Sequence, residues 1–181
     1  MKKILLLVVL TVSAAPLAAQ MANTAAPSTA VAATKAEWQD MAGYIARAAD
    51  QMSEANYSFR PTPEVRTFGQ LIGHLAGGQF LICAAALGEP PKYRENEFEN
   101  KATKAELTAA FKASTEYCNR AYAQSDAETT AMTKLFGGER TRLAALMRNT
   151  VHDGEHYGNI VTYMRMKGMV PPSSQPAPPA R

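Results

Sequence analysis

The chain has three histidines, and their positions suit a single metal ion. His152 and His156 are four residues apart in a stretch with helical periodicity, so their rings share one helix face with Cβ atoms about 5–6 Å apart. Two imidazoles so placed can bind a divalent cation when a third ligand approaches from another element. His74, in a different predicted helix, is the remaining imidazole. Three histidines with an open coordination position are typical of a catalytic zinc-type site.

The helix face that carries His152 and His156 is unusually polar. The residues that share that face are Arg148, Asn149, Asn159 and Tyr163. An apolar stripe lies beside it, made of Leu143, Leu146, Met147, Val151, Ile160, Val161 and Met164. Buried polar groups are costly unless they find partners, and a metal with its surrounding groups would supply them. The alternative interpretation is that both histidines face solvent on a polar helix surface.

Two glycines follow His74 at helical spacing. Gly77 and Gly78 lie three and four residues after it, and each glycine inside a helix costs about 1 kcal/mol relative to alanine. One explanation is close helix packing. The other is that the missing side chains leave space beside His74 for an ion and a substrate, and both can hold together.

Further polar residues near the histidines are candidates for chemistry. Glu155 and Tyr163 are the predicted catalytic residues: Glu155, or its neighbour Asp153, could orient a ligand histidine or act as a base. Tyr163, with Asn159 and Arg148, could contact a polar substrate.

The stretch from His152 to His156 also matches the H-x-x-E-H string of inverted zinc peptidases. Those enzymes need a further acidic ligand downstream, and no Asp or Glu follows Glu155.

Capping residues predict four helices. Thr34-Lys35-Ala36-Glu37 and Thr103-Lys104-Ala105-Glu106 are capping boxes, while Gly88 and Gly168 are natural helix ends. The predicted helices run from Thr34 to about Ser53, from Thr67 to about Leu87, from Thr103 to about Gln124 and from Thr141 to about Lys167. No strands are expected. The connection between the second and third helices can run the length of a helix, which favours an all-α four-helix bundle with up-down-down-up topology.

The two ends of the chain differ from its middle. Residues 1–19 have the basic start, short apolar run and small residues of a signal peptide. Residues 20–33 are predicted to be a flexible linker, 34–172 the bundle, and 173–181 a disordered Pro-rich tail. We therefore expect a periplasmic or secreted protein with no membrane span after cleavage. No basic stripe with interleaved aromatic residues is present, which argues against nucleic acid as a partner.

Cys83 and Cys118 are the two cysteines, and neither belongs to a C-x-x-C motif. This spacing gives no support for thioredoxin-like redox chemistry or covalent haem attachment. Export would permit a disulfide, and the two residues lie at similar heights if the second and third helices are parallel neighbours. Two separate buried thiols are the default expectation.

Taken together, the order and spacing of these motifs resemble the DinB-like (damage-inducible) superfamily of metal-binding four-helix bundles. The matching pieces are Thr67 to His74, His152-x3-His156 with Gly158, and the closing segment from Tyr163 to Pro171, so that the likeness spans about Ala36 to Pro172. The resemblance implies that His74, His152 and His156 bind a divalent ion, nickel or zinc in type, with manganese and iron as further candidates. Asn159 stands where many relatives carry Gln.

The resemblance also implies activities to consider. Characterised members include cytosolic enzymes that transfer low-molecular-weight thiols, so we expect a metal-dependent thiol transferase or hydrolase with a small-molecule substrate, a thiol among the candidates. The signal peptide is a departure, because an exported member would not meet cytosolic thiols. The alternatives are a metal carrier or sensor without catalysis, and a plain helical interaction domain whose histidines never meet. A homodimer is compatible with each of these alternatives.

Overall fold

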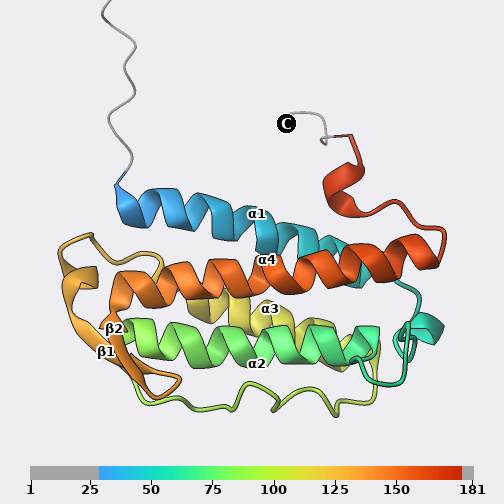
Figure 1. Cartoon of the computed structure of the whole chain (residues 1–181), viewed down its shortest axis with the longest axis horizontal. Helices are drawn as coiled ribbons and strands as arrows, with labels where there is room; N and C mark the ends of the chain where they lie inside the picture. The colour runs from blue at the N-terminus through green and yellow to red at the C-terminus, as the bar shows by residue number, and fades with distance from the viewer. Residues whose placement is uncertain (1–28, 177–181) are drawn as a thin grey trace, which may run out of the picture.

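Four long helices pack side by side in the computed structural model, which describes residues 29–176 (Figure 1). They are α1 (Ala30–Gln51), α2 (Phe68–Leu87), α3 (Lys104–Ala121) and α4 (Arg142–Met166). The mostly helical architecture agrees with the predicted all-α class. Helix α2 packs against α3 and α4, and α1 packs mainly against α4. The predicted signal peptide and residues 20–28 of the predicted linker lie outside the described residues.

Helix α1 begins earlier than its sequence predicts. Thr29 is its N-cap, and the Thr29 hydroxyl accepts a hydrogen bond from the Ala32 N–H. The Asp126 carboxylate accepts two more, from the N–H groups of Ala30 and Val31. Thr34, the predicted cap, instead donates its hydroxyl to the Ala30 carbonyl. A distant carboxylate therefore satisfies the free N–H groups of the first turn, and residues 30–33 are helical rather than linker.

Helices α2 and α3 have the predicted capping boxes and are joined by a disulfide. Thr67 and Thr103 each accept a hydrogen bond from the third helical residue, whose side chain bonds back to the cap N–H. Cys83 in α2 and Cys118 in α3 are bonded, with their Cα atoms 5.3 Å apart. This separation lies within the usual range of about 4.4–6.8 Å. The default expectation of two separate thiols is therefore wrong, and the disulfide that the sequence allowed is present.

The connection before α4 contains a small sheet that the sequence patterns do not predict. After a short 3-10 helix, η3 (Glu128–Thr130), strand β1 (Met132–Leu135) pairs antiparallel with β2 (Gly138–Thr141). Phe136 and Gly137 form the turn, both with positive φ. The Thr133 hydroxyl donates to the carbonyl of Ala85, near the end of α2. The expectation of no strands is therefore wrong, because a two-residue turn and docking on α2 stabilise a four-residue hairpin.

The apolar stripe of α4 differs from the predicted one at two positions. Met147 and Val151 are exposed, whereas Asn149, His152 and Asp153 are buried. Helix α4 begins at the predicted Thr141 cap, so the difference concerns its rotation and not its bounds. The polar face of α4 points inward at mid-length because side chains of α2 and of the end of α3 provide hydrogen-bond partners for those polar groups.

The connection between α2 and α3 lies along the side of α2 (Figure 1). A methyl group at Gly73 would lie 2.5 Å from the Phe98 carbonyl oxygen, and one at Gly77 would collide with the Glu95 carbonyl. Phe98 also packs against the rings of Phe80 and Tyr93. The close approach of this connection therefore depends on two glycines of α2, since any side chain there would displace its backbone.

The first residues of the predicted tail are structured. Pro172–Ser174 form a 3-10 helix, η4. The Tyr157 hydroxyl donates to the Ser173 hydroxyl and accepts from the Ser173 N–H, at 2.9 Å each. Gln175 exchanges side-chain amide hydrogen bonds with Gln51 of α1. The expected disorder is thus wrong for residues 173–175, and residues 177–181 lie outside the described part of the chain.

Helix α2 is long and apolar enough to cross a membrane by length and composition, but 78% of that apolar window is buried inside the bundle. Its apolar character is accounted for by its place in the core between α3 and α4.

Candidate metal centre

The three histidines converge between α2 and α4. The Nε2 atoms of His74 and His152 are 3.2 Å apart. One nitrogen from each of the three rings lies within 4.8 Å of the others. His74 and His152 are buried, and His156 is partly buried. The interpretation in which the histidines never meet is therefore wrong.

The tight fit of His152 against α2 depends on a glycine. A methyl group at Gly78 would lie 2.6 Å from Cε1 of the His152 ring. Gly77 gives its space to the backbone of Glu95. The two glycines after His74 thus serve close packing, and the room they create is taken by the His152 ring and the connection. The predicted empty space for a substrate is not found beside these two glycines.

The protein environment favours neutral imidazoles. Burial, followed by the charges of Arg66 and the other two histidines, lowers the pKa of His74 to about 3. Burial, followed by the charge of His152, lowers the pKa of His156 to about 4, although Glu155 acts in the opposite direction. Both rings are therefore neutral at pH 7, the state in which an imidazole nitrogen can bind a metal.

Carboxylates lie near the Nδ1 atoms of two of the rings. The Nδ1 atom of His74 is 3.0 Å from Oε1 of Glu99. Oδ1 of Asp153, which has no hydrogen-bond partner among the described residues, is 3.9 Å from Nδ1 of His152. We call the ring nitrogen that points away from the cluster the outer nitrogen, and the one that points into it the inner nitrogen. A carboxylate beside the outer nitrogen of a histidine directs the inner nitrogen toward the metal and raises its basicity. In both residues the outer nitrogen is Nδ1, which leaves the two Nε2 atoms facing each other.

Asp153 is itself held by a buried polar chain. It is fully buried, and its Oδ2 accepts a 2.9 Å hydrogen bond from Nε2 of Gln79. Oε1 of Gln79 in turn accepts from the hydroxyls of Ser114 and Thr115 on α3. Burial raises the pKa of Asp153, while neighbouring His152 and Gln79 oppose that shift. Side chains of α2, α3 and α4 therefore fix the carboxylate that faces His152.

A third carboxylate, Glu95, faces the inner nitrogens. Its Oε1 lies 3.4 Å from Nε2 of His152 and 3.9 Å from Nε2 of His74. Sequence patterns do not single out Glu95 or Glu99, because both lie in a charged connection without periodicity. One sequence signal could have pointed to them. The connection follows a helix that carries His74 and two closely spaced glycines, so its acidic residues could be expected to cover that face.

The two predicted catalytic residues differ in their exposure and in their contacts. Glu155 is exposed, and its charge reaches His156. Tyr163 is buried and donates its hydroxyl to the Arg66 carbonyl at 2.7 Å, which ties α4 to the segment before α2. Burial raises the pKa of Tyr163, while Arg66 opposes that shift. Asn159 lies beside His156, with Nδ2 3.4 Å from its Nδ1.

The donor set fits a divalent transition metal. Two nitrogens bound at about 2.0–2.1 Å in tetrahedral geometry lie about 3.3 Å apart, close to the separation of the two Nε2 atoms. Imidazole donors suit zinc, nickel, copper and iron rather than calcium or magnesium. The surrounding carboxylates match the groups that orient metal-bound histidines.

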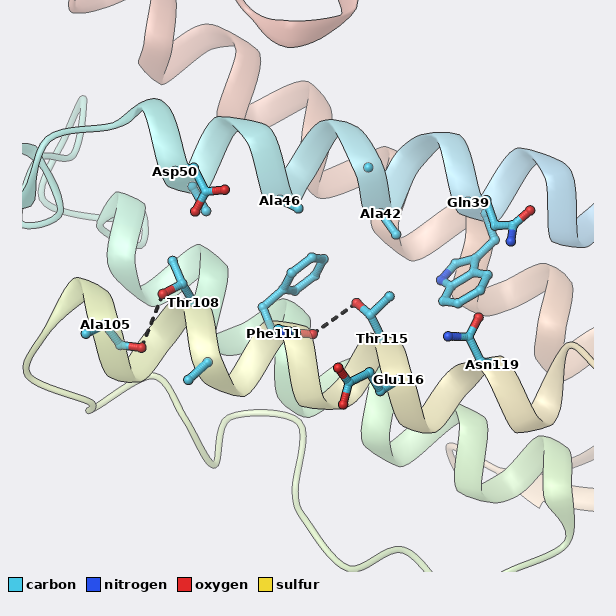
Figure 2. Close-up of a pocket in the computed structure, with 15 residues that line it drawn as sticks. Gln39, Ala42, Ala46, Asp50, Ala105, Thr108, Phe111, Thr115, Glu116 and Asn119 are labelled. Atoms are coloured by element: carbon cyan, nitrogen blue, oxygen red, sulfur yellow. Dashed lines mark hydrogen bonds between the residues drawn. The ribbon is translucent and has the colours of Figure 1, made fainter. Parts of the chain in front are cut away.

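A separate groove of about 680 Å³ lies between α1 and α3. Figure 2 shows its apolar floor, which includes Ala42, Ala46 and Phe111, and a polar rim with Asp50 and Glu116. None of its lining residues comes from α2 or α4, so it is distinct from the histidine cluster.

Comparison with known proteins agrees with this fold. Residues 33–160 match the DinB superfamily. A DinB-like protein from Bacillus cereus is 15% identical with a TM-score of 0.66, covering 77% of this chain and 93% of its own. One from Bacillus subtilis is 21% identical with a TM-score of 0.63, covering 80% and 99%. A histidine-to-alanine mutant of a mycothiol-dependent maleylpyruvate isomerase is 15% identical with a TM-score of 0.59, covering 83% and 81%. No curated protein sequence matches the chain.

Proposed function

Since this chain belongs to the DinB superfamily, we propose that His74, His152 and His156 hold a divalent metal ion in an exported thiol transferase or hydrolase. The observation that carries the proposal is the convergence of the three rings, two with pKa values far below neutrality. A metal with nitrogen ligands lowers the pKa of a coordinated water or thiol and so creates a nucleophile at neutral pH. Nickel and zinc are the leading ions, with manganese and iron as further candidates.

The proposed role of each residue around the site follows from its position. Glu99 contacts the outer nitrogen of His74, and Asp153 faces the outer nitrogen of His152, so that both Nε2 atoms face the same point. Glu155, on the exposed side of His156, is the proposed base that exchanges protons with solvent. Tyr163 is the proposed contact for a polar substrate group near Arg66, where its hydroxyl already meets a carbonyl.

A small molecule is the proposed substrate, with a thiol first among the candidates. The similar isomerase is named as mycothiol-dependent, which motivates a thiol here. Export would make the relevant thiol an extracytoplasmic one. A homodimer remains part of the proposal as an assembly state to be measured.

Export itself rests on two observations. Residues 1–19 have the character of a signal peptide, and the Cys83–Cys118 disulfide is a bond that oxidising compartments favour. We therefore propose a periplasmic or secreted location. Fractionation of cells expressing the full gene, with the mass of the purified chain, tests it: removal of an N-terminal segment and recovery outside the cytoplasm are expected, and an uncleaved cytoplasmic chain contradicts it.

We also propose that the helices run up-down-down-up. Cys83 and Cys118 occupy similar positions along α2 and α3, and their disulfide requires similar heights. The connection between these helices runs along α2 (Figure 1), as a link between parallel helices must.

A non-catalytic metal carrier or sensor is the second candidate function. The position of Glu95 favours it, because a carboxylate beside two inner nitrogens can occupy the place that a substrate would need. An exchangeable position on the ion favours the enzyme, and a closed site favours the carrier.

Metal content is the decisive test of the shared part of both functions. The full gene is expressed, the protein is purified without a tag, and plasma mass spectrometry measures its metals beside a His152→Ala variant. Near-stoichiometric nickel, zinc, manganese or iron that is lost in the variant supports the site. A chain that stays metal-free after reloading with each ion contradicts the enzyme and carrier functions together.

A further inference from the structure

The carboxylate of Glu95 lies where a ligand of the ion would lie. On the basis of the proposed metal site, we infer that Glu95 is a fourth protein ligand, supplied by the connection between α2 and α3, which closes the position left open by the three histidines. The expected occupant of that position after Glu95 leaves is a small anion, such as a thiolate or carboxylate.

The geometry places Glu95 at the inner side of the rings. Its Oε1 is 3.4 Å from Nε2 of His152 and 3.9 Å from Nε2 of His74, and those two nitrogens are 3.2 Å apart. Ligand atoms bound to zinc at about 2.0–2.2 Å in tetrahedral geometry are about 3.3–3.5 Å apart. Two of the three separations are close to these edges, and the third, from Oε1 of Glu95 to Nε2 of His74, is longer at 3.9 Å. A movement of the Glu95 carboxylate toward His74 would complete the coordination.

Glu99, four residues later, makes a useful contrast. Its carboxylate meets the outer Nδ1 of His74 and also pairs with Arg66 at 3.1 Å. The Glu95 carboxylate, in the part of the chain that the structure describes, faces the rings of His74 and His152 and forms no salt bridge with Lys or Arg. The two carboxylates therefore act on opposite sides of the His74 ring, one orienting it and one facing the metal position.

The packing of the connection holds Glu95 in place. The Glu95 carbonyl sits over Gly77, and Phe98 of the connection packs against Phe80 of α2 and against Tyr93 of the connection. Glu89, at the start of the connection, accepts a 2.7 Å hydrogen bond from Tyr117 of α3. The Glu95 side chain is 36% exposed, so solvent and small anions reach it even though its backbone is anchored. A ligand that is positioned from an anchored backbone yet open to solvent is well suited to being displaced.

The test uses the full chain loaded with Co²⁺, whose visible absorption reports the number and type of ligands. Wild type is compared with Glu95→Ala, with Glu99→Ala and with Glu97→Ala, an exposed neighbour that controls for the loss of one negative charge. His74→Ala controls for loss of the site. Two quantities are measured for each: the Co²⁺ dissociation constant, and the dissociation constant of azide from the Co²⁺-loaded protein. Melting curves of the metal-free proteins check that the variants fold alike.

We expect Glu95→Ala to weaken Co²⁺ binding by about tenfold or more, to change the Co²⁺ spectrum and to bind azide about tenfold more tightly than wild type. Glu97→Ala should match wild type in both quantities. Glu99→Ala should weaken Co²⁺ binding while keeping the wild-type resistance to azide. If Glu95→Ala leaves either the Co²⁺ or the azide dissociation constant unchanged, the fourth-ligand inference is overturned while the histidine site stands. If wild type itself binds no Co²⁺, the proposed function fails with it.

Discussion

Gly78 of α2 and His152 of α4 are packed so closely that any side chain at residue 78 would enter the imidazole. A Cβ atom there would lie 2.6 Å from Cε1 and 3.2 Å from Nδ1 of His152. Contacts shorter than about 3 Å between carbon atoms are strongly repulsive, so one of the two groups must move. The position of this ring thus depends on an absent side chain in another helix.

Gly78→Ala should therefore weaken metal binding, by about tenfold or more, since metal-bound histidines tolerate little displacement. The clash should also cost about 1–3 kcal/mol of unfolding free energy in the metal-free protein, less the helix propensity gained from alanine. Gly158→Ala is the matched control, because a methyl group there meets nothing within 4 Å. It should keep wild-type affinity and gain up to about 1 kcal/mol in stability. Titration calorimetry measures the metal affinity, and urea unfolding measures the stability. Equal metal affinities for the two variants would refute the packing argument.

Asp153→Asn should lower metal affinity without removing the site. The change removes the negative charge that faces Nδ1 of His152, while the amide can still accept the hydrogen bond from Gln79. Loss of such an orienting carboxylate costs about 10–100-fold in metal affinity. Asp50→Asn, at an exposed position of α1, is the control and should bind as wild type does. Unchanged affinity in Asp153→Asn would exclude an orienting role.

The disulfide should contribute strongly to stability. It closes a sequence separation of 35 residues between α2 and α3, and such bonds contribute about 2–4 kcal/mol. The Cys83→Ala/Cys118→Ala double variant should therefore unfold at a lower urea concentration than wild type. Dithiothreitol should shift wild type toward the variant and leave the variant unchanged. A wild-type transition that does not respond to full reduction would contradict this contribution.

The metal-free protein should lose stability as the pH falls below 7. An unfolded histidine has a pKa of about 6.5, whereas His74 and His156 have pKa values of about 3 and about 4 when folded. Between these values the unfolded chain binds more protons, so acid favours unfolding. The stabilising contribution is complete above about pH 6.5 and is lost progressively toward about pH 4 for His156 and about pH 3 for His74. Burial of Asp153 acts in the opposite sense, because its raised pKa lets the folded state take up a proton first.

His156→Gln isolates one of these two groups. Its urea midpoint should fall less than that of wild type between pH 7 and pH 4.5, with EDTA present in both. Parallel pH profiles for the two proteins would show that His156 does not carry the predicted shift.

Much of the helical framework could be predicted from local sequence. Thr67 and Thr103 cap their helices as predicted, and Gly88 ends α2 in the left-handed conformation. These features act within a few residues of each other, so their hydrogen bonds can be read directly from spacing. The start of α1 could not be read in that way, because the Asp126 carboxylate that supports it comes from a distant loop.

The three imidazoles, the one-turn spacing of His152 and His156 and the close approach allowed by Gly77 and Gly78 could all be predicted from local patterns. Which carboxylates meet these rings depends on the packing of distant segments: Glu99 lies at the outer nitrogen of His74, Asp153 beside His152, and Glu95 at the inner nitrogens. The two kinds of feature differ in the sequence distance over which the contacts act. Helix periodicity relates residues one turn apart, whereas the place of a long connection is set by the packing of its whole backbone against α2, which no local pattern encodes.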